Sequence, residues 1–314
     1  MTNLRKCAVI GVGFVGATAA FTLASSGLFS EIVLLDANQK KAEGEAADIS
    51  HGGAFTQPCL VRAGGYADLA ECGLIVIAAG ANQKPGETRI ELLGRNKAIL
   101  QSIIEQLAAV NREAILLIVS NPVDILTYMA QKLSGLPAER VIGTGTVLDT
   151  ARLKHLLGQH LQVDSRNVHA FIIGEHGDSE LAVWSSANIS GVDLADYCRI
   201  CGRDDSREAL DRIYRSVRDA AYQIIDGKGA TYYAIGLAVR RIAEAIVRDE
   251  HSVLPVSSRV DGPYGIADLC LGLPCVLGRS GVQNMLHIPL SAEETAQLQA
   301  SARKMRALLD QIGI

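Results

Sequence analysis

Short runs of consecutive apolar residues alternate with stretches of helical periodicity along the first half of the sequence. The apolar runs predict strands at 7–10, 32–35, 74–79, 115–119 and 140–143. These runs are apolar at successive positions rather than at alternate ones, so both faces of each strand are expected to be covered. Helices are predicted between them at 14–26, 39–51 and about 88–110. This succession of strands and helices predicts an α/β fold with a doubly wound parallel sheet.

The pattern changes in the second half of the chain. Its predicted elements are a helix at 148–161, a strand at 168–173, a hydrophilic connection at 193–205, helices at 206–225 and 230–247, and antiparallel strands within 252–281. A capping box formed by Ser291 and Glu294 begins the last helix. We therefore expect a dinucleotide-binding domain at 1–143, if the first half binds a nucleotide, and an α+β catalytic domain at 144–314.

Composition narrows the possible functions. The 314 residues are 48% apolar and carry a net charge of -4, so the chain has no basic excess with which to bind nucleic acid or an anionic membrane. The seven cysteines are odd in number and scattered, which is typical of a reduced, cytoplasmic protein. Cys198 and Cys201 form a CxxC pair, but no matching second pair accompanies them, and no metal site is expected.

The N-terminal segment has two interpretations. Arg5 and Lys6 precede an uncharged run at 7–24, as in a secretory signal peptide. The same run also divides into a strand, a glycine turn and a helix, and this second interpretation accounts for all of its residues. No other uncharged apolar run is long enough to span a bilayer.

The glycine turn itself points to a cofactor. Gly11, Gly13 and Gly16 have the spacing of a Rossmann-type fingerprint, in which a pyrophosphate lies on the N-terminus of the following helix. Asp36 ends the next predicted strand, where a carboxylate binds the ribose hydroxyls and repels a 2′-phosphate. The pattern therefore favours NAD over NADP. The alternative is a tight turn followed by an ordinary surface aspartate.

Hydride transfer to a nicotinamide also requires the movement of a proton, for which histidine is suited near neutral pH. His176 lies between Gly174 and Gly177 in a polar turn directly after an apolar strand. Flanking glycines permit a ligand to approach closely. An ordinary loop histidine is the alternative interpretation.

Two further segments carry candidate chemistry. Asp149 and Arg152 share one face of a predicted helix, either as a surface ion pair or as a carboxylate that orients a base beside a guanidinium that binds a substrate carboxylate. The polar segment 81–89 follows a buried strand, at the edge of the sheet where ligands bind. Pro85 and Gly86 mark a turn within it, at which a lid is expected to hinge.

Several motifs in the same order make the whole chain resemble the NAD-dependent lactate/malate dehydrogenases, and within them the bacterial L-lactate dehydrogenases. They are GVGFVG at 11–16, GANQKPGETR at 80–89, SNPVD at 120–124, LDTAR at 148–152, IIGEHGDS at 172–179 and GKGATYYAIG at 227–236. The resemblance implies reversible hydride transfer between (S)-lactate and NAD. It also implies a homotetramer whose substrate is a small 2-hydroxy or 2-oxo acid.

The resemblance assigns a role to each candidate residue. It implies that His176 exchanges the hydroxyl proton, that Asp149 orients its ring, and that Arg152 pairs with the substrate carboxylate. Arg89 would polarise the C2 carbonyl when the lid closes, and two further residues would lie beside substrate, Asn121 and Thr231. The cofactor residues implied besides Gly11, Gly13, Gly16 and Asp36 are Val15, Lys41, Tyr66, Gly80, Ala81, Ser102, Val119, Asn121 and Thr144.

Gln83 bears on the choice of substrate. The resemblance implies that malate-type members carry arginine there, to meet a second carboxylate. A neutral amide leaves that carboxylate unpaired, which is costly away from water. Gln83 therefore favours a substrate with a methyl side chain. The alternatives are a malate dehydrogenase, a dehydrogenase of L-2-hydroxy acids with bulkier side chains, and a catalytically silent NAD-binding protein.

One departure concerns regulation. The resemblance implies an effector site for fructose 1,6-bisphosphate between subunits, formed by an arginine and a histidine. His169 is present here, but Lys154 occupies the arginine position. Lysine keeps the charge and loses the bidentate geometry of a guanidinium. Weak activation, or none, is expected.

Overall fold

The first half of the chain forms the predicted parallel sheet. The structure is a computed structural model that describes residues 2–81, 86 and 89–313. The parallel strands are β1 (Asn3–Ile10), β2 (Glu31–Leu35), β3 (Leu60–Ala63), β4 (Cys72–Ile77), β5 (Ile115–Ile118) and β6 (Val141–Gly143). They lie in the order β3-β2-β1-β4-β5-β6, which changes direction at β1 as in a doubly wound fold. The predicted α/β fold class is confirmed.

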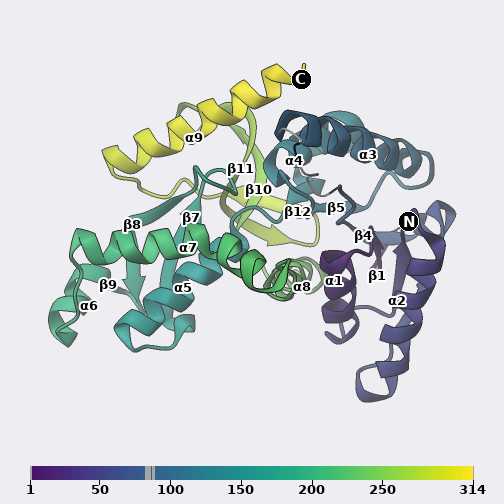
Figure 1. Cartoon of the computed structure of the whole chain (residues 1–314), viewed down its shortest axis with the longest axis horizontal. Coiled ribbons are helices and arrows are strands. Elements are labelled where there is room, and N and C mark those ends of the chain that lie inside the picture. Colours follow the sequence, from purple (N-terminus) through teal and green to yellow (C-terminus); the bar gives the residue numbers. More distant parts are fainter. Residues whose placement is uncertain (1, 82–85, 87–88, 314) are drawn as a thin grey trace.

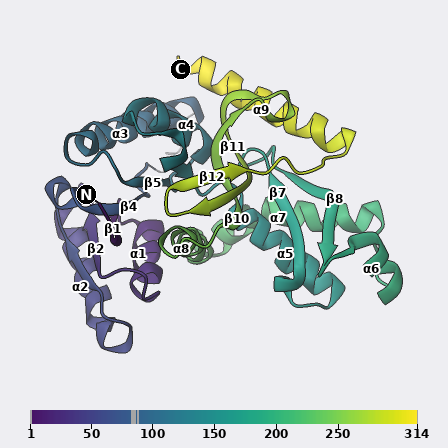
Figure 2. The same cartoon turned by 180° about the vertical axis from the view of Figure 1, so that it is seen from behind.

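Helices cover both faces of this sheet (Figures 1 and 2). They are α1 (Phe14–Ala24), α2 (Gln39–His51), α3 (Arg89–Val110) and α4 (Val123–Ser134). Ala8 and Ile10 of β1 face the core shared with α3 and α4, whereas Cys7 and Val9 face the core shared with α1 and α2. This two-sided burial explains why the strands are apolar at successive positions.

The second half adds strands to the same sheet and forms a smaller one. Its strands are β7 (Val168–Ile173), β8 (Leu181–Ile189), β9 (Val192–Asp193), β10 (Ser252–Asp261), β11 (Ala267–Gly278) and β12 (Gly281–Met285). β10, β11 and β12 pair antiparallel with one another, and β10 joins the parallel strands through the pairing of Ser257 with Gly143. β7, β8 and β9 form a separate antiparallel sheet. The predicted antiparallel segment thus reaches residue 285.

Five α-helices complete the second half within the described residues. They are α5 (Val147–Leu161), α6 (Leu194–Cys201), α7 (Arg207–Lys228), α8 (Tyr233–Val247) and α9 (Ala292–Gln311). α8 lies beside α1 in both views, where the Thr22 hydroxyl donates to the Gly236 carbonyl at 2.9 Å (Figures 1 and 2). α9 begins with the predicted capping box of Ser291 and Glu294. None of the helices within 2–81 and 89–313 is both long and apolar enough to cross a bilayer.

The hydrophilic connection predicted at 193–205 is wrong in part, because α6 forms there. Leu194 and Cys198 lie one helical turn apart and are both buried, while Asp196 and Arg199 form an exposed ion pair. The apolar face is only two side chains wide, too short to stand out among charged neighbours. The sequence pattern also gave no prediction for β3, α4 or β8.

Candidate active site

A short loop after β7 carries His176, and three neighbouring elements hold its backbone. Gly174 exchanges two backbone hydrogen bonds with Gly272 of β11, both 2.9 Å long. The next amide, that of Glu175, donates to the Ser301 hydroxyl of α9 at 3.1 Å. The amide of His176 donates to Oδ2 of Asp124 on α4 at 2.8 Å. Three successive amides are therefore fixed by three different elements.

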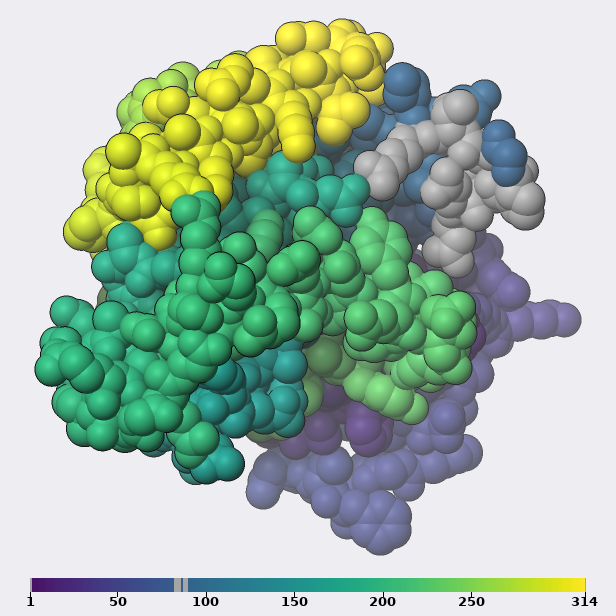
Figure 3. Space-filling view, turned by 60° about the vertical axis from the view of Figure 1, so that its left-hand side comes forward, coloured from purple at the N-terminus to yellow at the C-terminus, as the bar shows by residue number. Residues whose placement is uncertain are grey.

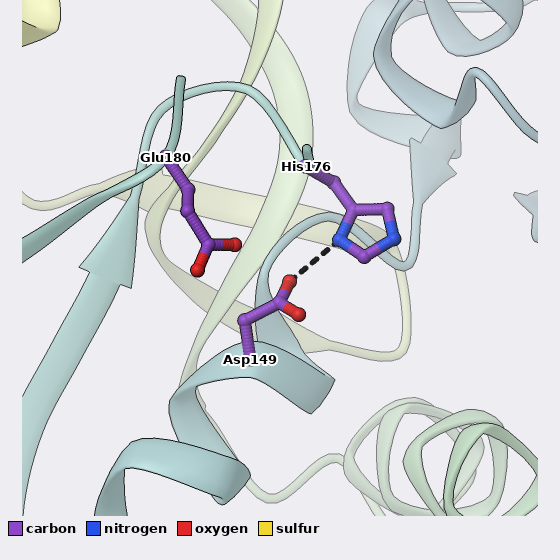
Figure 4. Close-up of side chains that lie close together, drawn as sticks. All are labelled: Asp149, His176 and Glu180. Atoms are coloured by element: carbon purple, nitrogen blue, oxygen red, sulfur yellow. Dashed lines mark hydrogen bonds and ion pairs between the residues drawn. The ribbon is translucent and has the colours of Figure 1, made fainter. Parts of the chain in front are cut away.

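The imidazole of His176 pairs with Asp149 in the first turn of α5. Nδ1 of the ring lies 2.6 Å from Oδ2 of Asp149, whose side chain is only 2% exposed (Figure 4). The other carboxylate oxygen accepts a hydrogen bond from Arg152 at 2.8 Å. Asp149 and Arg152 thus form an ion pair, as one interpretation of their spacing predicted, but a largely buried one that includes His176.

This environment favours the charged imidazolium. Burial opposes the charge, but the adjacent Asp149 carboxylate and its hydrogen bond raise the pKa of His176 to about 9, with smaller contributions from Asp124 and Glu180. Burial likewise opposes ionisation of Asp149, yet His176 and Arg152 keep the pKa of that carboxyl below its ordinary value. The ring side chain is still 26% exposed, so His176 combines a buried partner with access from outside. Such a group is suited to general acid–base catalysis.

Sequence reasoning missed two buried carboxyls at this site. Asp124 accepts hydrogen bonds from the His176 amide and, at 2.5 Å, from the Ser257 hydroxyl. Burial raises the pKa of Asp124 to about 6, although both hydrogen bonds oppose the shift. Glu180 is buried just before β8. The available signal was that Asp124 ends the SNPVD motif and that Glu180 directly follows the IIGEHGDS motif. Only the fold brings Asp124 to the His176 loop.

A cavity of about 850 Å³ lies at the carboxyl ends of the parallel strands. Among its lining residues are Gly11, Gly13, Asp36, Lys41, Tyr66, Gly80 and Ser102, all of which the sequence analysis assigned to the cofactor. A Cβ on Gly11 would lie 2.4 Å from Ala79, and one on Gly16 would lie 1.8 Å from the Gly11 carbonyl oxygen. These two glycines therefore permit the close packing of the turn.

The same turn leaves space for an anion. Gly13 is the N-cap of α1, and no side chain among the described residues caps that helix end. A Cβ on Gly13 would meet no described residue within 4 Å, so the described part of the chain leaves the space beside the helix N-terminus open. The Asp36 carboxylate lies next to this glycine turn. Its Oδ2 accepts a hydrogen bond from the amide of Val12 and its Oδ1 accepts one from the amide of Asn38, each at 2.9 Å. The residues present fit a dinucleotide with unmodified ribose hydroxyls.

Asn96 of α3 connects two of the predicted binding segments. Its buried side-chain oxygen accepts from the amide of Ala81 at 2.8 Å, and its Nδ2 donates to the carbonyl of Asn121 at 2.9 Å. Val119 and Thr144 are buried at the ends of β5 and β6, on the same edge of the sheet. Asn96 was not predicted, because an asparagine within a helix has no sequence signal for a link between two loops.

The remaining predicted residues are placed as follows. Val15 and Gly16 lie in the first turn of α1, and Thr231 lies in the connection between α7 and α8. Gln83 lies outside the described residues. Arg89 begins α3, but its side chain also lies outside what the structure describes. Lys154 and His169 line one cavity of about 560 Å³ together with Arg241, where burial lowers the pKa of Lys154.

Comparisons with known proteins agree with this arrangement. Residues 5–143 match the model of the lactate/malate dehydrogenase NAD binding domain. Residues 146–313 match the model of the lactate/malate dehydrogenase alpha/beta C-terminal domain. Together these two matches cover nearly the whole chain.

Relatives and solved structures give the same result. The chain is 51% identical to an L-lactate dehydrogenase of Acetivibrio thermocellus, over 99% of this chain and 98% of the relative. It is 53% identical to the L-lactate dehydrogenase of Thermoanaerobacterium saccharolyticum, over 99% of this chain and 100% of the relative. A crystal structure of a lactate dehydrogenase from a Medee basin deep-sea metagenome library superposes with a TM-score of 0.96 at 46% identity, over all of both chains. The crystal structure of the minor L-lactate dehydrogenase from Enterococcus mundtii also superposes with a TM-score of 0.96, at 40% identity over 99% of each chain. This chain therefore belongs to the lactate/malate dehydrogenase family.

Proposed function

We propose that this chain is an NAD-dependent L-lactate dehydrogenase, which interconverts (S)-lactate and pyruvate. The observation that carries the proposal is the pairing of the partly exposed His176 with the buried Asp149, beside Arg152. The relatives that are about half identical to the chain are named L-lactate dehydrogenases. When bound, NAD supplies a nicotinamide ring that accepts hydride from C2 of lactate or returns it to pyruvate.

His176 moves the proton that accompanies this hydride. Because Nδ1 is held by Asp149, Nε2 is the ring atom that faces substrate, and it takes the hydroxyl proton of lactate as C2 is oxidised. In the reverse direction the imidazolium donates that proton to the carbonyl oxygen of pyruvate. Asp149 stabilises the imidazolium, so its charge sets how readily the ring holds the proton.

The other assigned residues position the substrate and exclude water. Arg152 has several N–H donors, so it can bind the substrate carboxylate while one N–H remains on Asp149. We assign Arg89 to the C2 oxygen, Asn121 and Thr231 to the edge of the substrate, and Gln83 to its methyl group. The segment 81–89 is assigned the role of a lid, and most of it lies outside the described residues. Its closure would remove water and strengthen these interactions.

We assign cofactor binding to the cavity at the carboxyl ends of the strands. Gly11, Gly13 and Gly16 would hold the pyrophosphate against α1, and Asp36 would bind the ribose hydroxyls. The other assigned positions are Val15, Lys41, Tyr66, Gly80, Ala81, Ser102, Val119, Asn121 and Thr144. We also propose that 1–143 and 144–314 act as the cofactor and catalytic domains.

We propose a cytoplasmic homotetramer as the assembly. Exposed apolar side chains support an oligomer, since Phe21, Tyr233 and Leu237 line a hollow of about 380 Å³ between α1, α2 and α8. Lys154 and His169 share a cavity, which supports a weak fructose 1,6-bisphosphate site there. Sedimentation with and without the bisphosphate tests both assignments.

A panel of 2-oxo acids tests the proposed activity. NADH oxidation is measured with pyruvate, oxaloacetate and 2-oxoisocaproate, for the parent and for His176→Asn. Pyruvate should give the highest kcat/KM, and the variant should lose about 10²–10⁴-fold in turnover while still binding NADH. A preference for oxaloacetate or 2-oxoisocaproate would contradict the substrate assignment. Parent-like turnover in His176→Asn would remove this residue from the reaction.

A further inference from the structure

A second buried carboxyl lies beside the pair of Asp149 and His176. Glu180 is only 5% exposed. Its amide donates to the Gly177 carbonyl of the loop, and its carbonyl accepts a hydrogen bond from the Tyr214 hydroxyl of α7. Figure 4 shows its carboxyl directed toward the pair. One carboxyl oxygen of each acid and one ring nitrogen of His176 all lie within 4.8 Å of one another. Its Oε1 is buried and accepts no hydrogen bond from the part of the chain that the structure describes.

The charges around Glu180 act in opposite directions. Burial and the nearby Asp149 carboxylate raise the pKa of Glu180 to about 8, and His176, Arg152 and Arg218 oppose that shift. Further charged or titratable groups border the same region, namely Tyr214 and Asp211 on α7 and Glu294 and Lys304 on α9. Glu180 is therefore mostly uncharged near neutral pH.

Glu180 also reaches a cavity that is separate from the cofactor cavity. This cavity of about 630 Å³ lies between β8, α7 and α9 and shares no lining residue with the cofactor cavity. Figure 3 shows this face of the molecule, with α9 (yellow) lying above α7 (green). Glu180 thus lies between the Asp149–His176 pair and a cavity other than the cofactor cavity.

We propose, on the basis of the proposed function, that Glu180 is a positioning residue whose charge sets how firmly the Asp149–His176 pair holds the catalytic proton. While Glu180 is protonated, Asp149 is the carboxylate that pairs with the imidazolium, and Asp124 adds a smaller contribution. When Glu180 ionises in alkaline solution, its charge adds to that of Asp149 and keeps the proton on His176. Two acids and one histidine at this spacing titrate as a coupled group.

The pH dependence of pyruvate reduction tests this role. In Glu180→Gln the alkaline midpoint of kcat/KM should fall by about one pH unit, because no second carboxylate forms. Near pH 6.5 the variant should stay within about threefold of the parent, since glutamine then resembles the protonated acid. A structural role alone would lower activity equally at every pH, and that result would overturn the proposal. An unchanged midpoint would overturn it as well.

Glu293→Gln is the matched control. This residue lines the same cavity, but its side chain is 60% exposed and pairs with Arg207 at 2.8 Å. The same charge is removed at the rim, so the midpoint should not move. Glu180→Asp keeps the charge and should restore most of the alkaline activity that glutamine loses.

Titration of the His176 ring by NMR gives a readout that does not depend on activity or on a variant. In the parent without substrate, the ring signals should shift in two steps, because Glu180 ionises within the same range. A single step would overturn the role of Glu180 even if pyruvate were reduced. Two steps in a protein that reduces no pyruvate would instead contradict the proposed function and leave the coupling intact.

Discussion

Asp149→Asn removes one charge from the active site and leaves the size of the side chain nearly unchanged. The substitution affects an oxygen that lies 2.6 Å from Nδ1 of His176 in a buried position. An amide at this place cannot stabilise the imidazolium as a carboxylate does. It can also donate a hydrogen bond to Nδ1 and so favour the ring tautomer in which Nε2 carries the proton.

The expected magnitude follows from the protonation of His176. Burial lowers the pKa of His176, but Asp149 outweighs this effect and raises the pKa from an ordinary value of 6.5 to about 9. Near pH 7.5 about 97% of a group with that raised pKa is protonated, compared with about 9% at the ordinary value. Pyruvate reduction requires the imidazolium, so its kcat/KM should fall at least about tenfold. Burial without the carboxylate lowers the pKa further, which enlarges the loss.

The assay is the pH profile of kcat/KM in both directions. For the parent, pyruvate reduction should decline as pH rises through about 9, and lactate oxidation should increase over the same range. In Asp149→Asn both transitions should move to lower pH, and pyruvate reduction should recover partly in acid. Binding of NADH is the control, because Asp149 does not line the cofactor cavity. Transitions that stay near pH 9 in the variant would refute the reasoning.

Three further substitutions test other parts of the site. Asp36→Ser should narrow the preference for NADH over NADPH, measured as the ratio of kcat/KM, since the carboxylate beside the ribose repels a 2′-phosphate; equal use of both cofactors by the parent would contradict the assignment. Gln83→Arg should raise kcat/KM for oxaloacetate and lower it for pyruvate, because a guanidinium pairs with the added carboxylate; an unchanged ratio would show that residue 83 does not face the substrate side chain. Asp124→Ala should lower the free energy of unfolding by about 2–5 kcal/mol, because the His176 amide and the Ser257 hydroxyl lose their buried acceptor; denaturant unfolding measures this change, and a loss under about 0.5 kcal/mol would show that solvent replaces the carboxylate.

The sequence predicted the parallel half of the fold well, because its signals there are local. The apolar runs of β1, β2, β4 and β5 are buried on both faces, and the helices between them keep a clear period. Helix α6 was not predicted, because its two buried side chains do not produce a recognisable pattern among charged neighbours. The joining of β10 to β6 through Ser257 and Gly143 is a contact between distant segments, which no local pattern contains.

The site divides in the same way. Gly11, Gly13 and Asp36 are linked by a short spacing along one strand–turn–helix unit, so the chain order alone brings them to one cavity. The grouping of His176 and Asp149 required the resemblance, because 27 residues separate them and either residue alone is ordinary. Asp124, Asn96 and Glu180 escaped prediction because their roles depend on burial and on partners that only the folded chain supplies.

The three anchored amides of the His176 loop have a consequence for local stability. Loops usually exchange their amide hydrogens quickly, because solvent reaches them through small fluctuations. Here the amides of Gly174, Glu175 and His176 are bonded to β11, α9 and α4, so they can exchange only when a contact with one of these elements opens. Their protection should therefore approach that of the core. Ser301 lies in the middle of α9, so the middle anchor is lost only when the opening of α9 extends beyond its terminal turns. Such an opening would loosen the catalytic loop before the rest of the molecule unfolds.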